Sequence, residues 1–245
     1  MNEQAIRTLV EGIVRSALSA AGNGAGTGHE TGHCPDRTGC GLPAQGGVNC
    51  VDLIPVELSA RHAHLSEEHA LELFGAPLTP ARELSQPGQF LCKERVRLIG
   101  PRGVMDNVAV LGPSRGSSQV EISRTDARIL GVDVPVRQSG DVDGTPGIIL
   151  ASETGIVGLE QGLIVAARHI HMSPEDAARF GVSDRDLVNV RLDGERPVVL
   201  EDVLVRVSGS FRLALHIDAD EGNSSGWNKS VSGRITGGKA HAVRH

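Results

Sequence analysis

The chain has 245 residues with 2% aromatic residues, 31 glycines and a formal net charge of -6. This charge argues against a general nucleic-acid binder, whose affinity would come from a Lys/Arg surface. No apolar run reaches the roughly 18 to 20 residues of a membrane span, and the N-terminus lacks the basic start and apolar core of a secretion signal. We therefore expect a soluble protein that is neither membrane-bound nor secreted.

Residues 2–21 have the pattern of an amphipathic helix. Apolar residues recur at helical spacing, at Ile6, Leu9, Val10 and Ile13. Residues 22–47 contain nine glycines and have the composition of a flexible linker. An apolar stripe on a tether needs a partner. We expect the helix to dock on another protein, and the alternative is that it folds back onto the main body.

The four cysteines do not form a disulfide framework. Their density is low and their spacing, with His29 and His33 nearby, fits no compact metal motif. Reduced thiols are expected, and Cys92 is expected to serve packing. No role is assigned to the remaining three, Cys34, Cys40 and Cys50.

A six-residue phrase occurs twice in the second part of the chain. Residues 51–59 predict a strand that leads into Arg61-His62-Ala63-His64-Leu65-Ser66, and the phrase recurs as Arg168-His169-Ile170-His171-Met172-Ser173. In each copy the serine can cap a short helix that ends at a glycine, Gly75 or Gly181. Each copy therefore predicts a strand, a histidine pair and a capped helix.

The other predicted elements are mostly short strands. They are expected at residues 88–98, 104–111, 118–123, 147–150, 187–192, 198–207 and 211–217, with a helical turn at 126–130 and turns at 101–103, 112–113 and 193–194. Many short strands with few helices favour small barrels. We predict a mainly β fold of two small β-barrel domains.

The expected domain organisation has five parts. A helix at residues 1–21 is followed by a linker at 22–50, a first barrel domain at 51–143, a second barrel domain at 144–236 and a frayed tail at 237–245. The barrel boundary is placed in the cluster of glycines and proline between Gly140 and Gly147.

The two histidine pairs predict a metal centre. Histidines two residues apart project from the same face of a strand, so each copy offers two imidazoles side by side. Further candidate ligands are His216, at the end of a predicted strand, and Glu121, which alternates with Gln119. Imidazole with carboxylate suits zinc best, and six ligands suit two ions. Glu121 and His216 do not stand at matching positions of the repeat, so one asymmetric cluster is expected. His69 is expected at the surface.

Four arginines near glycines and serines form a second candidate group, Arg115, Arg124, Arg137 and Arg206. A guanidinium can bind phosphate oxygens in a bidentate manner, and ion pairing at the surface is the alternative for each. The sequence lacks the GxxxxGK[ST] loop, a convincing GxGxxG turn and the GxSxG elbow. Nucleotide hydrolysis, dinucleotide chemistry and serine hydrolase chemistry therefore have no support.

Several separated motifs resemble the PduL-type phosphate acyltransferases of bacterial microcompartments. Beside the two histidine phrases they are Pro87-Gly88-Gln89-Phe90, Leu111-Gly112-Pro113-Ser114-Arg115, Gln119-Val120-Glu121-Ile122-Ser123, Pro135-Val136-Arg137-Gln138-Ser139-Gly140-Asp141 and His216-Ile217-Asp218-Ala219-Asp220-Glu221-Gly222-Asn223. The resemblance covers about residues 51–235. It implies two β-barrel domains with a dimetal site between them, and an N-terminal helix that carries the enzyme into a microcompartment shell.

The resemblance also implies site residues. Metal ligands fall on His62, His64, Glu121, His169, His171 and His216, and residues that support the metals or handle phosphate fall on Gln89, Arg115, Gln119, Ser139 and Arg206. The implied cofactors are two divalent ions, with zinc favoured, and the co-substrate is CoA.

The implied reaction is reversible: an acyl-CoA and phosphate give an acyl phosphate and CoA, by direct attack of metal-bound phosphate on the thioester. Two alternatives stay open. A cupin-like oxygenase would use one iron and leave the second histidine pair idle. A zinc-stabilised scaffold without catalysis would have a closed coordination sphere. The expected partners are acyl-CoA, phosphate and shell or cargo proteins, and a homo-oligomer is left open.

Overall fold

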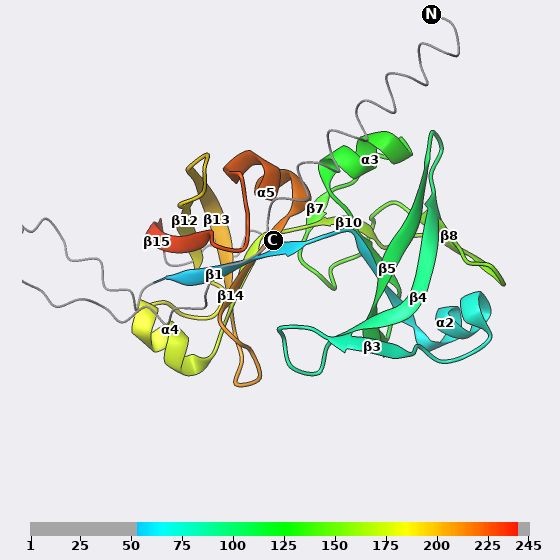
Figure 1. Cartoon of the computed structure of the whole chain (residues 1–245), viewed down its shortest axis with the longest axis horizontal. Helices are drawn as coiled ribbons and strands as arrows, with labels where there is room; N and C mark the ends of the chain where they lie inside the picture. The colour runs from blue at the N-terminus through cyan, green and yellow to red at the C-terminus, as the bar shows by residue number, and fades with distance from the viewer. Residues whose placement is uncertain (1–52, 240–245) are drawn as a thin grey trace, which may run out of the picture. The chain divides into compact units, whose positions relative to one another are not determined.

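The computed structural model describes residues 53–239 of the chain (Figure 1). The expected helix at 2–21 and the linker at 22–50 lie outside the described residues. Within 53–239 the structure has fifteen strands and four short helices, which are α2 (Glu67–Phe74), α3 (Arg124–Leu130), α4 (Pro174–Phe180) and α5 (Ala219–Ser225). The expectation of a mainly β fold is therefore confirmed. Among these described helices, none has the length and apolar character needed to cross a membrane.

One group of strands forms a closed barrel. Its order is β1 (Ile54–Ser59), β14 (Ala214–Asp218), β11 (His169–Met172), β13 (Val198–Val207), β12 (Leu187–Leu192) and β15 (Ser232–Lys239), which pairs back onto β1. Alternate residues of these strands point inward, as the buried Val188, Val190 and Leu192 show on β12. Small aliphatic side chains fill the interior, as the low aromatic content led us to expect.

The other strands form a curled, open sheet. Its order is β7 (Val136–Arg137), β10 (Leu163–Ala166), β6 (Gln119–Glu121), β2 (His62–Ser66), β5 (Val104–Arg115), β4 (Phe90–Ile99), β8 (Ile148–Ala151) and β9 (Ile156–Leu159), with β3 (Pro80–Glu83) paired to β4. Its core is separate from that of the barrel and includes the fully buried Leu98, Leu150 and Leu163. We call this group the open sheet below.

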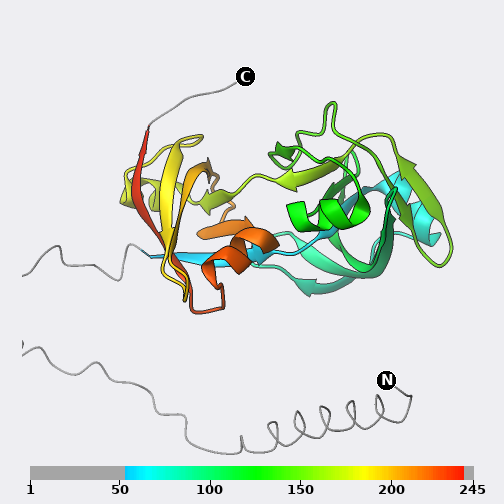
Figure 2. The same cartoon turned by 90° about the horizontal axis from the view of Figure 1, so that it is seen from above.

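The strand before each histidine pair belongs to the other group of strands. β1 precedes the first histidine pair but pairs with β14 and β15 of the barrel, and β10 precedes the second pair but pairs with β6 and β7 of the open sheet. The chain crosses from barrel to sheet after β1 and back after β10, along the cyan and yellow-green segments of Figure 2. Both histidine pairs directly follow a crossing. Sheet membership thus departs from the expected division into 51–143 and 144–236, which stays a prediction about domains.

The helices after the histidine pairs begin and end as predicted. The Ser66 side chain accepts a hydrogen bond from the backbone of His69 at the start of α2, and Ser173 caps α4 in the same way with Pro174 in the first turn. Both helices end at a glycine in the left-handed region, Gly75 with φ 67° and Gly181 with φ 65°. These local signals fix the chain direction after each histidine pair.

Several elements differ from the expectation. Local sequence patterns did not predict β3, β7, β9, β10, α5 and β15. Gly237 to Lys239, assigned to a tail, pair with β12 as part of β15, so that assignment is wrong for these residues. Gly112 and Pro113, expected in a turn, lie within β5. The ring of Phe90 lies over Gly112, where an added Cβ would come within 2.2 Å of a ring carbon, so close packing explains this glycine.

Candidate metal centre

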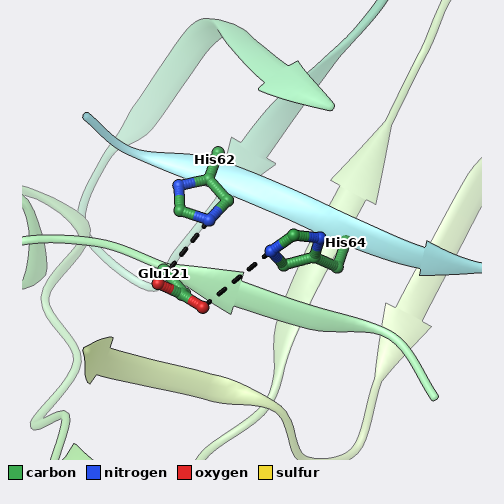
Figure 3. Close-up of side chains that lie close together, drawn as sticks. All are labelled: His62, His64 and Glu121. Atoms are coloured by element: carbon green, nitrogen blue, oxygen red, sulfur yellow. Dashed lines mark ion pairs between the residues drawn. The ribbon is translucent and has the colours of Figure 1, made fainter. Parts of the chain in front are cut away.

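The first histidine pair and Glu121 form a compact, buried group. His62 and His64 project from one face of β2, and Glu121 lies on the neighbouring strand β6 opposite His62 (Figure 3). The Nε2 atom of His62 is 3.5 Å from Glu121 Oε2, and that of His64 is 4.0 Å from Glu121 Oε1. One ligand atom from each residue lies within 4.8 Å of the other two. This is the spacing of a group that could bind one cation.

A hydrogen-bond network orients Glu121. Its Oε1 atom accepts hydrogen bonds from the Gln119 amide at 2.6 Å and the Ser139 hydroxyl at 2.8 Å. Arg115 donates from Nη1 to the Ser139 oxygen at 3.1 Å, and the Gly140 backbone N–H donates to Gln119 Oε1 at 2.7 Å. The strand register and the loop after β7 therefore hold this carboxylate in one orientation.

The second histidine pair meets His216. His169 and His171 lie on β11, and His216 lies opposite His169 on β14. The rings of His169 and His216 are stacked with centroids 5.1 Å apart, and those of His171 and His216 are 4.8 Å apart with an interplanar angle of 63°. Three imidazoles from the barrel therefore face one another, without a carboxylate at the position that Glu121 occupies in the first group.

The two groups share one backbone arrangement, which corrects the expectation that Glu121 and His216 do not match. β2 and β6 are antiparallel with His62 opposite Glu121, and β11 and β14 are antiparallel with His169 opposite His216. A parallel strand lies on the far side of each second strand, where Ile164 is opposite Glu121 and Glu57 is opposite His216. Glu121 and His216 are thus equivalent, as are Ile164 and Glu57.

Further contacts repeat the same arrangement. The first histidine of each pair has its Nδ1 atom within hydrogen-bond distance of a backbone carbonyl two residues earlier, at 2.8 Å for His62 and 2.9 Å for His169. A neutral imidazole that donates from Nδ1 presents the Nε2 lone pair, which is the form that binds a cation. Both first histidines are thus set in the same tautomer by the crossing segments.

Burial keeps most of these imidazoles neutral. Burial, followed by the charge of His62, lowers the pKa of His64 to about 3. Burial and the neighbouring histidines lower the pKa of His171 to about 2, and burial with His169 lowers that of His216 to about 3. Burial would raise the pKa of Glu121, but His62, His64 and the Ser139 hydrogen bond lower it overall. His64, His171 and His216 therefore offer neutral imidazoles, and Glu121 offers an ionised carboxylate, at neutral pH.

These donors fit divalent cations. Within residues 53–239, buried side-chain nitrogens without a hydrogen-bond partner include His64 Nδ1, His171 Nδ1 and His216 Nε2. Unpartnered buried polar atoms are costly and need an explanation. Neutral imidazole and carboxylate are the ligands that zinc and other first-row divalent ions prefer. A cation bound to His216 Nε2 would account for that nitrogen.

Both groups lie on one cleft of about 420 Å³. All six expected metal ligands line it, together with Gln89, Arg115, Ser139 and Arg206. Gln119 does not line the cleft but contacts Glu121 and Ser139. Arg115 comes from β5 of the open sheet and Arg206 from β13 of the barrel. The structure therefore gathers the expected site residues at the seam between barrel and sheet.

Comparisons with known proteins agree with this arrangement. The phosphate propanoyltransferase family model matches residues 55–228. The phosphate propanoyltransferase of Leptotrichia buccalis is 53% identical over 186 residues, 75% of this chain and 88% of that protein. The one of Listeria monocytogenes serovar 1/2a is 44% identical over 237 residues, 96% of this chain and 97% of that protein. The chain belongs to the phosphate propanoyltransferase family. The expected resemblance and the expected enzyme class, an acyltransferase, are confirmed.

Two of the four candidate arginines lie away from the cleft of this family member. Arg124 is 3.6 Å from Asp133, and Arg137 is 3.7 Å from Asp141. These exposed ion pairs match the alternative stated for them. His69 is half-buried, and its Nδ1 atom lies 2.7 Å from the Ser118 hydroxyl oxygen. Cys92 is fully buried in the sheet core, as expected, and burial raises its pKa to about 11.

Three residues of the cleft were missed by sequence reasoning. The ring centroid of Phe211 lies 4.2 Å from that of His171, and Arg206 Cζ lies 5.8 Å from the Phe211 ring centroid. Gln86, 3% exposed, donates to the Arg212 carbonyl at 3.0 Å and accepts from the Arg212 N–H at 3.2 Å. Glu57 faces His216. These contacts join segments far apart in sequence, so no local pattern indicated them.

Proposed function

We propose that this family member is a phosphate acyltransferase that interconverts a short-chain acyl-CoA and phosphate with an acyl phosphate and CoA. One observation carries the proposal: two histidine pairs from two different sheets share a cleft with Arg115 and Arg206. The names of the relatives, which are phosphate propanoyltransferases, support the same reaction class. The substrates are then an acyl-CoA with a short acyl chain and inorganic phosphate.

We infer that the two groups hold two divalent cations, with zinc favoured by the donor set. His62, His64 and Glu121 would bind one, and His169, His171 and His216 the other. Bound cations would orient phosphate and offset the negative charge that develops on the thioester oxygen. Gln119 and Ser139 donate to Glu121 and so orient this ligand.

The arginines of the cleft bind and orient phosphate in this proposal. Arg115 is fixed by its hydrogen bond to Ser139, and Arg206 lies over the Phe211 ring. Planar guanidinium groups held from two sides suit the oxygens of one tetrahedral anion. A phosphate oxygen forms a bond to the acyl carbon, the carbon–sulfur bond breaks, and the sulfur leaves with CoA. No cysteine or serine acyl carrier is needed, and Cys92 is buried in the core.

The direct test is thiol release from acetyl-CoA or propionyl-CoA in the presence of phosphate. The purified full chain is assayed as isolated, after chelation and after cation return. We expect activity to be lost on chelation and restored by a divalent cation. The variant Glu121→Gln should lower activity, whereas Glu153→Gln, at an exposed turn away from the cleft, should not. Activity that survives thorough metal removal would contradict the metal-assisted reaction.

The alternatives predict other results. An oxygenase with one iron would consume oxygen and would not need His169 or His171, yet both lie in the same cleft as His62. A scaffold with a closed coordination sphere would not turn over any CoA ester. Both groups line a cleft, which favours substrate access over a closed coordination sphere.

We also propose that residues 2–21 bind shell or cargo proteins of a bacterial microcompartment, which would place the enzyme there. Support comes from the amphipathic pattern followed by a glycine-rich segment. The Listeria relative aligns over 237 residues, so its match extends well beyond the barrel and sheet. Deleting residues 1–21 should leave thiol release unchanged and abolish co-purification with shells. Retained co-purification would contradict the targeting role.

A further inference from the structure

The two histidine groups are equivalent in backbone, but the position of Glu121 is a histidine in the second group. Three neutral imidazoles would leave the full double charge of a divalent cation uncompensated, whereas His62, His64 and Glu121 reduce it by one. A carboxylate near the second group would restore the balance. Glu57 is placed to supply it, because its strand β1 crosses from the barrel and lies beside His216.

The distances around Glu57 match those around Glu121. Glu57 Oε2 is 3.8 Å from His216 Nε2, between the 3.5 Å and 4.0 Å that separate Glu121 from His62 and His64. That His216 nitrogen is buried and has no hydrogen-bond partner within residues 53–239. The pair therefore has the spacing that the compact first group shows between its own candidate ligands.

Both carboxylates are also held by a serine from a loop. Ser139 donates to Glu121 Oε1 at 2.8 Å, and Ser85 donates to Glu57 Oε2 at 2.5 Å. Ser139 follows β7 and Ser85 follows β3, so the two serines come from unrelated segments of the open sheet. Glu57 and Ser85 both line the cleft. Ser85 thus holds the same Glu57 oxygen that lies 3.8 Å from His216 Nε2, and a carboxylate oxygen that accepts one hydrogen bond keeps a further lone pair for a cation.

The first group has an apolar residue, and not a carboxylate, at the backbone position equivalent to Glu57. Ile164, the counterpart of Glu57, is fully buried beside Glu121 and can only serve packing. In the second group the same position lies at the cleft, where the Glu57 side chain is 36% exposed against 9% for Glu121.

We propose that Glu57 is the carboxylate ligand of the second cation position, together with His169, His171 and His216. This inference rests on the proposed metal centre and deepens it. The two cation positions then have the same charge, but they receive their carboxylates from non-equivalent strands. The carboxylate of the second position is the more exposed of the two.

The test is cation binding by the stripped full chain, measured as zinc per chain and as affinity in competition with a chromogenic chelator. The wild type should bind two ions. Glu57→Gln, which keeps the side-chain shape, should bind one ion as the wild type does and the second at least ~10-fold more weakly. Ser85→Ala should weaken the same ion less, and the exposed control Glu153→Gln should change neither.

Each ion is assigned to its position by combining the two variants and by crystals of the zinc-loaded chain. Glu121→Gln should weaken the other ion, and the double variant should lose both. The Glu57 carboxylate should contact the second ion in the loaded crystals. Two ions bound by Glu57→Gln with unchanged affinities, or a loaded structure in which Glu57 turns away, would overturn the role of Glu57 and leave the metal centre standing. A wild type that binds no cation would overturn both, and retained thiol release would then separate the reaction from its metals.

Discussion

The two ligand groups have one backbone plan and two chemistries. In each, a strand that carries two histidines pairs with a strand that carries one further ligand opposite the first histidine. That further ligand is Glu121 in the open sheet and His216 in the barrel. Strand register therefore determines where the ligands lie, and the residue opposite the first histidine determines whether that strand supplies a carboxylate or an imidazole.

The surroundings of the two further ligands differ as well. Glu121 accepts hydrogen bonds from Gln119 and Ser139, so its orientation is fixed within the protein. His216 Nε2 has no such partner in the described part of the chain and faces Glu57. The first group is therefore organised before a cation arrives, and the second depends more on the cation itself.

The largest effect should follow from removing equivalent ligands. His64→Ala and His171→Ala occupy matching positions, and we predict that each lowers kcat/KM for acyl-CoA by at least ~10²-fold, because both cations stabilise the same developing charge. Thiol release measures this. His69→Ala, an imidazole outside the cleft, serves as the control. A large loss in only one of the two ligand variants would show that one group is not part of the active site.

A smaller effect is expected from the two cleft arginines. Arg115→Lys and Arg206→Lys keep the charge but lose the planar fork, so the KM for phosphate should rise about 10-fold in each. Phosphate saturation curves measure this change. Arg124→Lys, whose arginine is paired with Asp133 at the surface, should match the wild type. If Arg206→Lys alone had no effect, the barrel would supply ligands but no phosphate contact.

The smallest effect should come from Ser139→Ala. Loss of one hydrogen bond to Glu121 corresponds to about 1 kcal/mol, or roughly a fivefold weaker cation affinity at the first position. Competition with a chelator measures this affinity. The ion at the second position should be unaffected, because Ser139 contacts none of the barrel histidines. Equal weakening of both ions would indicate that the two groups are coupled through the Arg115 network.

Much of this arrangement could be predicted from local sequence signals. The caps Ser66 and Ser173, the glycines that end their helices and the same-face histidine pairs need only neighbouring residues. The strands β9 and β10 lie in short segments without a clear alternation, and β15 is rich in glycine, so these were missed. Such strands are specified by their partners rather than by their own residues.

The equivalence of Glu121 and His216 could not be seen in the sequence. Glu121 follows His62 by 59 residues and His216 follows His169 by 47, because β3 and the loops around it occur only in the first copy. Strand pairing obscures the equivalence further, because β1 pairs with β14 of the barrel and β10 pairs with β6 of the open sheet. For the same reason nothing in the residues around Glu57 indicated that this side chain faces His216. Register across distant strands is the information that local patterns lack.

The most direct test of the central claim, one active site built from two equivalent cation positions, is a titration of the stripped enzyme with zinc while thiol release from propionyl-CoA and phosphate is followed. We predict that the stripped enzyme is inactive and that activity reaches its plateau only when two equivalents of zinc are bound. Full activity at one equivalent, or activity in the stripped enzyme, would contradict the claim.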